Sequence, residues 1–143
     1  MTGLTTNIGS ILGRCLGESA PRGLVSAYLF GGHAAGRAHR ESDVDVAVLL
    51  AWDVHPTARA RFDERLRLWA LLVSAQRNDR IDLVVLNDVP PHLGRCIVTT
   101  GRRVFCSDPE LDHAFVRDVQ LRAADLEPFL RRTRQVKLAA IRR

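Results

Sequence analysis

The segment LFGGHAAGRAHRESDVDVAVLL, residues 29–50, places two aspartates inside an apolar strand pattern, shortly after a pair of glycines. In an extended strand, residues two positions apart point to the same face, so Asp43 and Asp45 are expected to lie side by side. Two carboxylates in that arrangement repel each other, and carboxylates are seldom buried without a partner. The segment therefore predicts a strand whose two aspartates bind a cation.

The glycine pair, Gly31 and Gly32, stands where the preceding strand is expected to end. Glycines allow a tight turn and leave backbone N–H groups open to bind phosphate oxygens. Asp43 and Asp45 supply hard oxygen ligands, which suit Mg²⁺, an ion usually bound by one or two carboxylates together with substrate phosphates. Phosphate-binding amides beside metal-binding carboxylates predict nucleotidyl transfer.

A third acid, Asp82, interrupts the apolar run RIDLVVLND at residues 80–88, where it shares a strand face with Val84 and Leu86. If this strand lies beside residues 43–50, three carboxylates converge. Asp82 could then bind the metal as well and help to deprotonate an attacking hydroxyl. The alternative is an acid at the sheet edge that pairs with Arg80.

Hydrophobic periodicity predicts the element order α-β-β-α-β-α-β-α. Helices are expected at residues 5–18, 56–76, 90–101 and from Pro109 onward, and strands at residues 24–31, 43–50, 80–88 and 102–107. This order predicts a small mixed sheet of about four strands backed by helices, in the α/β or α+β class. The length predicts one domain over residues 1–143, with a core at about 5–107 and a C-terminal helical extension at about 108–143.

Several side-chain features are expected in and beside the helices. In residues 56–76 an apolar stripe faces the core, and an Asp63–Arg67 ion pair lies on the surface; the stripe consists of Phe62, Leu66, Trp69 and Val73. Trp52 and Trp69 are expected to be packing residues rather than base-stacking platforms. Pro128 is expected to break or kink the last helix.

Composition narrows the class of protein. No run of about 18 apolar residues is present, which excludes a membrane-spanning helix. The first twenty residues lack the basic region and continuous apolar stretch of a secretory signal. The three cysteines and five histidines have no metal-ligand spacing. These features predict a cytoplasmic protein with reduced cysteines and without a membrane partner.

The net charge of +5 is concentrated at one end of the chain. Residues 128–143 contain six basic and no acidic residues, so the rest of the chain has 15 basic against 16 acidic residues. A neutral body with a basic tail suits docking to an acidic partner at least as well as binding to nucleic acid, and no direct nucleic-acid contact is expected. A solvated helix surface is the simpler alternative for the tail.

The motif at residues 29–50 resembles the signature of the DNA polymerase β-like nucleotidyltransferases, which is Gly-Ser, ten residues, then Asp-x-Asp. Here Gly31-Gly32 is followed by ten residues and then Asp43-Val44-Asp45. More narrowly, the chain resembles the minimal nucleotidyltransferases (MNT) of HEPN/MNT toxin–antitoxin pairs, in its size, in its "IDLVVLND" strand followed by "PPHL…G" and in its helical extension.

This resemblance implies an antitoxin that transfers AMP from ATP to a tyrosine hydroxyl of a cognate HEPN ribonuclease toxin and silences it. It implies that Gly31 and Gly32 bind phosphate, that Asp43 and Asp45 bind Mg²⁺, and that Asp82 completes the site. Arg37 and Ser42, in the intervening segment, are further candidates for nucleotide binding. The basic end of the chain is expected to dock the toxin in a hetero-oligomer.

Two positions depart from the family pattern. The family serine falls at Gly32, so its hydroxyl is missing, and a basic residue of the family falls at Ala35. The backbone amide of Gly32 remains, and Arg37 or Arg40 could supply charge. Two alternatives therefore stay open: a degenerate protein that inhibits its toxin by binding alone, and an enzyme that modifies a small-molecule hydroxyl.

Overall fold

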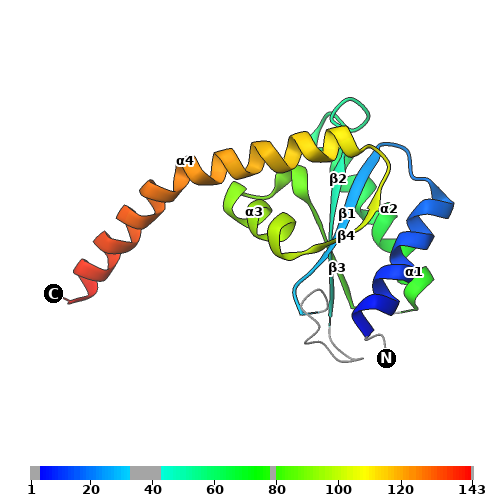
Figure 1. Cartoon of the computed structure of the whole chain (residues 1–143), viewed down its shortest axis with the longest axis horizontal. Coiled ribbons are helices and arrows are strands. Elements are labelled where there is room, and N and C mark those ends of the chain that lie inside the picture. Colours follow the sequence, from blue (N-terminus) through cyan, green and yellow to red (C-terminus); the bar gives the residue numbers. More distant parts are fainter. Residues whose placement is uncertain (1–3, 33–42, 78–79, 143) are drawn as a thin grey trace.

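A computed structural model describes residues 4–32, 43–77 and 80–142 of the chain. The helices are α1 (Leu4–Ser19), α2 (Ala58–Gln76), α3 (Pro91–Thr100) and α4 (Pro109–Arg142), with a short 3₁₀ helix at Leu86–Asp88. The strands are β1 (Leu24–Phe30), β2 (Val44–Leu50), β3 (Ile81–Val85) and β4 (Arg102–Cys106). The predicted element order and the α/β class with a mixed four-stranded sheet are confirmed (Figure 1).

The four strands form one sheet in the order β3-β2-β1-β4. β1 pairs antiparallel with both β2 and β4, whereas β2 and β3 run parallel. A parallel pair needs a crossover connection, and α2 provides it between β2 and β3. The C-terminal end of β1 and the N-terminal ends of β2 and β3 therefore lie at the same end of the sheet.

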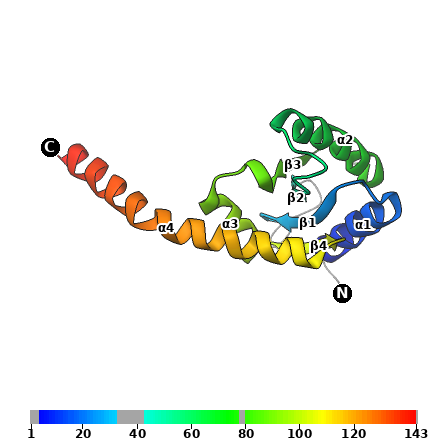
Figure 2. The same cartoon turned by 90° about the horizontal axis from the view of Figure 1, so that it is seen from above.

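The sheet is covered on both faces, and the strand alternation decides which residues face which helices (Figure 2). On β2, the even positions from Val44 to Leu50 pack with α1 and α2, where they join leucines such as Leu12 and Leu68. The odd positions, including Ala47, pack on the other face with residues of α3 and α4. Asp45 belongs to the odd set, so it lies on the face opposite Val44 as predicted, whereas Asp43 directly precedes β2.

The predicted packing of α2 is wrong for three of the four residues in the stripe, and only Val73 of these four packs against the core. Phe62 and Leu66 are each 49% exposed, and Trp69 is 37% exposed. The buried residues of the helix are instead Arg61, Glu64, Leu68 and Leu72. The core therefore receives leucines from a neighbouring stripe of the helix.

Ion pairs and side-chain hydrogen bonds explain how α2 turns this face inward. The buried Glu64 pairs with Arg67, and Asp63 pairs with Arg59, so the expected Asp63–Arg67 pair is also wrong. Trp69 Nε1 donates a 2.8 Å hydrogen bond to the carbonyl oxygen of Ile81, and Arg65 Nε donates a 2.7 Å bond to that of Leu83. Side chains of α2 thus satisfy two carbonyls of the edge strand β3, which limits pairing of that edge with another chain.

Trp52 is not buried in the core, because it is 55% exposed after the end of β2. The guanidinium of Arg61 lies over its ring, 4.7 Å from the ring centroid. Arg61 is itself fixed by a two-pronged ion pair with Asp88 and by a 3.1 Å hydrogen bond to the carbonyl oxygen of His55. This tryptophan is therefore held in a fixed position at the surface.

α4 begins under a side-chain cap from Asp108 and continues past Pro128, so the helix is not broken there. Its axis changes direction along its length, and the C-terminal part projects beyond the rest of the molecule (Figure 1). The first part packs on α3 and β1. The helix thus has a supported half and a projecting half.

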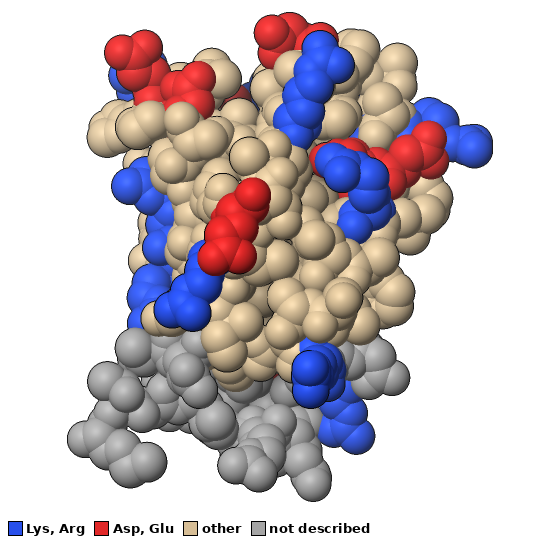
Figure 3. Space-filling model, turned by 90° about the vertical axis from the view of Figure 1, so that its right-hand side faces the viewer, with Lys and Arg blue, Asp and Glu red and all other residues tan. Residues whose placement is uncertain are grey.

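None of the helices in the described part of the chain is long and apolar enough to cross a membrane. On the surface that carries α1 and α2, acidic and basic side chains are interspersed among uncharged ones (Figure 3). All three cysteines lie in the described residues and are free thiols, and partial burial raises the pKa of Cys15.

Candidate functional site

The pairing of β2 with β3 brings two of the predicted carboxylates together. Asp45 and Asp82 are direct partners in the parallel register, so their side chains leave the sheet on the same face. A 2.8 Å hydrogen bond from the Val44 amide to the carbonyl oxygen of Arg80 extends the pairing to the start of both strands. Asp43, two residues before Asp45, lies at the same sheet end. The two strands are therefore neighbours, as the convergence of the acids requires, but Asp43, Asp45 and Asp82 are not gathered into one three-carboxylate metal site.

The three carboxylates lie where the apolar cover of this face ends. Further along the same face, β2 contributes Ala47 and Leu49 to the buried cluster under α3 and α4. At the sheet end, Asp45 is half-buried, whereas Asp43 and Asp82 are exposed. The acids can thus be reached from solvent while the strands that carry them are rigidly packed.

Gly31, which the sequence placed beside the carboxylates, packs directly against Asp45, a contact that sequence reasoning did not predict. It follows Phe30, the register partner of Asp45, and has a φ of +75°, a conformation that favours glycine. A Cβ atom at Gly31 would overlap Oδ2 of Asp45. Glycine is therefore required here both by the turn and by the carboxylate packed against it.

Gly32 is exposed and follows Gly31 in the turn. Arg37 and Ser42, the other candidates for nucleotide binding, lie outside the described residues, as do Ala35 and Arg40. The part of the site that the structure describes therefore consists of the glycine turn and the carboxylates of β2 and β3.

The carboxylate oxygens at this sheet end suit a hard divalent cation that is also coordinated by oxygen atoms of the substrate. Among residues 4–32, 43–77 and 80–142, no three His, Cys, Asp or Glu side chains are gathered closely enough to bind a metal by themselves. Mg²⁺ does not need such a group, because it is commonly bound by one or two carboxylates, phosphate oxygens and water. Asp43 and Asp45 meet that lower requirement.

A second cluster of polar side chains was missed in the sequence. Asp112 of α4 is 3% exposed and accepts hydrogen bonds from Ser26 Oγ at 2.6 Å, Tyr28 Oη at 2.8 Å and Arg103 at 2.9 Å. Burial and the hydrogen bond to Asp112 raise the pKa of Tyr28 far above its usual value. Ser26 and Tyr28 alternate along one face of β1, and that period of two was the available signal. The cluster joins α4 to β1 and β4.

Comparison with known proteins agrees with this geometry. Residues 20–110 match the family model described as polymerase beta, nucleotidyltransferase. A curated relative from Shewanella oneidensis, protein adenylyltransferase MntA, is 34% identical over 92 residues, which are 64% of this chain and 60% of the relative. The match thus spans less than two thirds of that relative's length.

Two solved structures are similar over nearly the whole chain. One is a chain of a toxin–antitoxin crystallised with AMP-PNP, at 27% identity and a TM-score of 0.65, covering 94% of this chain and 98% of that one. Another is a chain of the toxin–antitoxin MntA-HepT, at 25% identity and a TM-score of 0.59, covering 96% and 99%. The family model spans the glycine turn and all three carboxylates, and the chain belongs to the polymerase beta nucleotidyltransferase family.

Proposed function

We propose that the protein is an antitoxin that transfers AMP from ATP to a tyrosine hydroxyl of a HEPN toxin. The observation that carries the proposal is the register pair Asp45–Asp82, with Gly31 packed against Asp45 at the end of β1. The reaction and partner are supported by the similarity to the adenylyltransferase MntA and to chains of toxin–antitoxin complexes, one of them with an ATP analogue. We place the reaction in the cytoplasm, where ATP is available.

In this reaction the tyrosine oxygen attacks the α-phosphorus of ATP. A new P–O bond forms to the tyrosine, the bond to the β-phosphate oxygen breaks, and pyrophosphate leaves. Asp82 accepts the hydroxyl proton, a role that needs an accessible carboxylate within reach of the nucleophile. The amides of Gly31 and Gly32, assisted by Arg37 and Ser42, bind phosphate oxygens.

Asp43 and Asp45 are the proposed ligands of Mg²⁺, and Asp82 completes the set. The ion, when bound, stabilises negative charge on the attacking and leaving oxygens and orients the triphosphate. The protein's contribution is to fix the carboxylates: Asp45 is confined between β3 and the turn at Gly31. Such fixed geometry reduces the reorganisation needed to reach the transition state.

A second candidate is inhibition by binding alone, and the residue that favours it is Gly32. A hydrogen bond to a charged group contributes about 1.5–3 kcal/mol, so loss of the family serine weakens the phosphate site by up to that amount. Such a loss lowers ATP affinity but does not remove the carboxylates. We therefore retain the enzyme as the primary proposal.

The test is the intact mass of a cognate HEPN protein, to be sought in a neighbouring reading frame by its Arg-x-x-x-x-His motif, after incubation with the chain, Mg²⁺ and ATP. We expect the mass to rise by one or more AMP units, with the modification on tyrosine, and to stay unchanged with Asp43→Asn/Asp45→Asn. Inhibition of the toxin without a mass change supports binding alone. AMP transfer only to a small-molecule hydroxyl supports the third alternative and contradicts the protein acceptor.

A further inference from the structure

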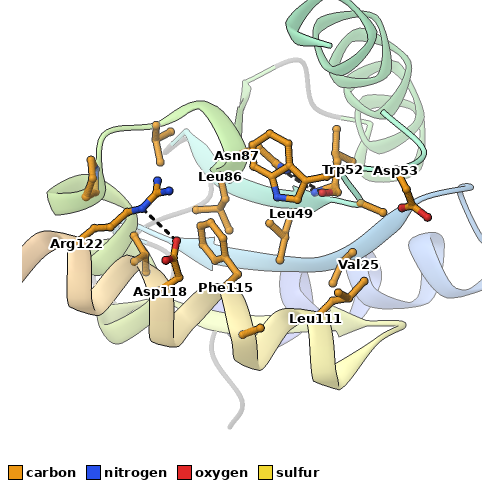
Figure 4. A pocket seen from close by; sticks show the side chains of 16 residues that line it. Val25, Leu49, Trp52, Asp53, Leu86, Asn87, Leu111, Phe115, Asp118 and Arg122 are labelled. Atoms are coloured by element: carbon orange, nitrogen blue, oxygen red, sulfur yellow. Dashed lines mark hydrogen bonds and ion pairs between the residues drawn. The ribbon is translucent and has the colours of Figure 1, made fainter. Parts of the chain in front are cut away.

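An apolar cavity of about 540 Å³ lies between the first half of α4 and the sheet (Figure 4). Its walls come from β1, β2, the segment after β3 and α4, and they include Val25, Leu49, Leu86, Phe115 and Val119. The volume is in the range of ligand-binding pockets in proteins. The cavity is thus large enough to receive a bulky side chain.

The rim of the cavity carries two large exposed apolar side chains. Trp52 is 55% exposed and Leu111 is 47% exposed, and both line the cavity. The stacked guanidinium of Arg61 holds Trp52 in position. Tryptophans beside apolar pockets often contribute most of the binding energy at protein interfaces. Because Trp52 is already held in place, it loses little side-chain entropy when a partner binds.

The polar groups in the cavity wall are already occupied. Asn87 accepts a hydrogen bond from the Leu50 amide at 2.9 Å and donates one to the Leu50 carbonyl oxygen at 2.8 Å. Asp118 pairs with Arg122 at 3.2 Å. Both interactions are visible in Figure 4. The cavity therefore favours an apolar occupant over one that needs many hydrogen bonds.

Positive charge increases from one end of the cavity along α4. Asp53 lies at the Trp52 end, whereas Arg122 lies at the α4 end. Arg122 is paired with Asp118, and Arg131 is paired with Glu127, so the excess of positive charge begins at the exposed Arg132. Residues 128–143 contain six basic and no acidic residues. A binding partner that continues from the cavity along α4 therefore meets a basic surface, which is complementary to acidic side chains.

The cavity and the carboxylates lie at opposite ends of the sheet. Leu49 is four residues beyond Asp45 on β2, which is about 13 Å along an extended strand. A small acceptor cannot contact both places, whereas a protein can. A docking site separate from the reaction site thus favours a protein acceptor.

We infer that this cavity and the exposed side of α4 form the docking surface for the partner protein, an inference that rests on the proposed function. The partner inserts an aromatic or leucine side chain between Trp52 and Leu111. Acidic residues beside that anchor lie along α4 towards Arg131 and Arg132. The carboxylate end of the sheet is left free for the tyrosine that is modified.

Filling the cavity tests this assignment. Ala114 is exposed on α4 and lines the cavity, so Ala114→Trp places an indole where the anchor would lie. The neighbouring His113 is exposed and is not part of the lining, so His113→Trp is the matched control. Leu111→Ser is a second test variant. It removes an apolar side chain from the rim and leaves the cavity unfilled.

Each variant is titrated calorimetrically with the cognate HEPN protein in the absence of ATP. In a separate titration without the HEPN protein, each variant is titrated with Mg²⁺–ATP. We expect Ala114→Trp to weaken binding of the HEPN protein by about 30-fold, the factor that corresponds to a typical interface hot spot, and Leu111→Ser by about tenfold. His113→Trp should bind as the unmodified chain does, and ATP affinity should be the same in all.

The outcomes separate the docking surface from the proposed function. If the unmodified chain binds the HEPN protein and Ala114→Trp and Leu111→Ser bind it equally well, the docking surface is wrong and the proposed function stands. If the unmodified chain does not bind the HEPN protein, both are wrong. Charge steering is strongest at low salt. If Arg131→Glu/Arg132→Glu leaves the association rate unchanged at low salt, the partner has no acidic residues along this part of α4 and that element of the proposal is wrong.

Discussion

Asp45 of β2 lies directly beside Asp82 of β3 in a parallel register, and the turn at Gly31 packs against the Asp45 carboxylate. A ligand that binds the folded chain and not the unfolded chain stabilises the fold. Binding of a metal–nucleotide complex to this sheet end is therefore expected to stabilise the folded chain.

The first prediction concerns that stabilisation. Mg²⁺ and ATP together should raise the melting temperature, since a ligand at a hundredfold excess over its Kd adds about 2.7 kcal/mol to the free energy of unfolding. Asp43→Asn/Asp45→Asn should fold but show no such rise. Asp63→Asn, which alters an exposed ion pair with Arg59 on α2, is the control and should respond fully. A full response of the double variant would remove both aspartates from the metal site.

The second prediction compares two glycines. Gly17 of α1 has no atom within 4 Å of an added Cβ, so Gly17→Ala should raise the free energy of unfolding by about 0.5–1 kcal/mol. Gly31→Ala should lower it, because the left-handed conformation costs about 1–2 kcal/mol and the new methyl overlaps Asp45. Urea unfolding measures both values. Equal stability of the two variants would show that Gly31 is not constrained as described.

The third prediction restores the family residue. Gly32→Ser should increase ATP affinity by about tenfold, since one hydroxyl donor to a charged phosphate oxygen contributes at least 1.5 kcal/mol. Calorimetric titration with Mg²⁺–ATP measures the change. Unaltered or weaker affinity, with an unchanged circular dichroism spectrum, would mean that glycine is required at this position.

The fourth prediction tests the buried Asp112. Asp112→Ala leaves the buried hydroxyls of Ser26 and Tyr28 without their shared acceptor and should cost about 1–3 kcal/mol of stability for each of them. Tyr28→Phe deletes one hydrogen bond and should cost about 1 kcal/mol. Thermal unfolding distinguishes the two. Similar small losses would mean that α4 is held by apolar packing alone.

Tyr28 adds a pH dependence to the same cluster. Its folded-state pKa is raised, so the unfolded chain loses the tyrosine proton first as pH rises. The contribution is therefore complete below about pH 10 and is lost above it. Tyr28→Phe should remove that part of the alkaline loss of stability.

The strands and their faces could be predicted because their side chains alternate in a simple way. In β2, four valine and leucine positions are buried on one face and Asp45 lies on the other, as the period of two requires. The register of Asp45 with Asp82 could not be predicted, because strand order depends on contacts between distant segments. The close contact of Gly31 with Asp45 follows from the antiparallel register of β1 with β2, in which Phe30 is the partner of Asp45.

The packing of α2 could not be predicted from hydrophobicity. The helix carries apolar residues on two neighbouring stripes, and the stripe of Leu68 and Leu72 faces the core. The other stripe remains outside because Trp69 and Arg65 are used to satisfy carbonyls of β3. Such bonds between side chain and backbone depend on tertiary structure and leave no periodic signal in the sequence.

The central claim, that the chain is an enzyme acting on its toxin, is tested most directly by turnover. The measurement is the amount of AMP incorporated into the HEPN protein when that protein is in large excess over the chain, with Mg²⁺ and ATP present. An enzyme should incorporate many moles of AMP per mole of chain, and the toxin should stay inactive as a ribonuclease after the chain is removed. No incorporation, with inhibition that is stoichiometric and lost on dilution, would contradict the claim.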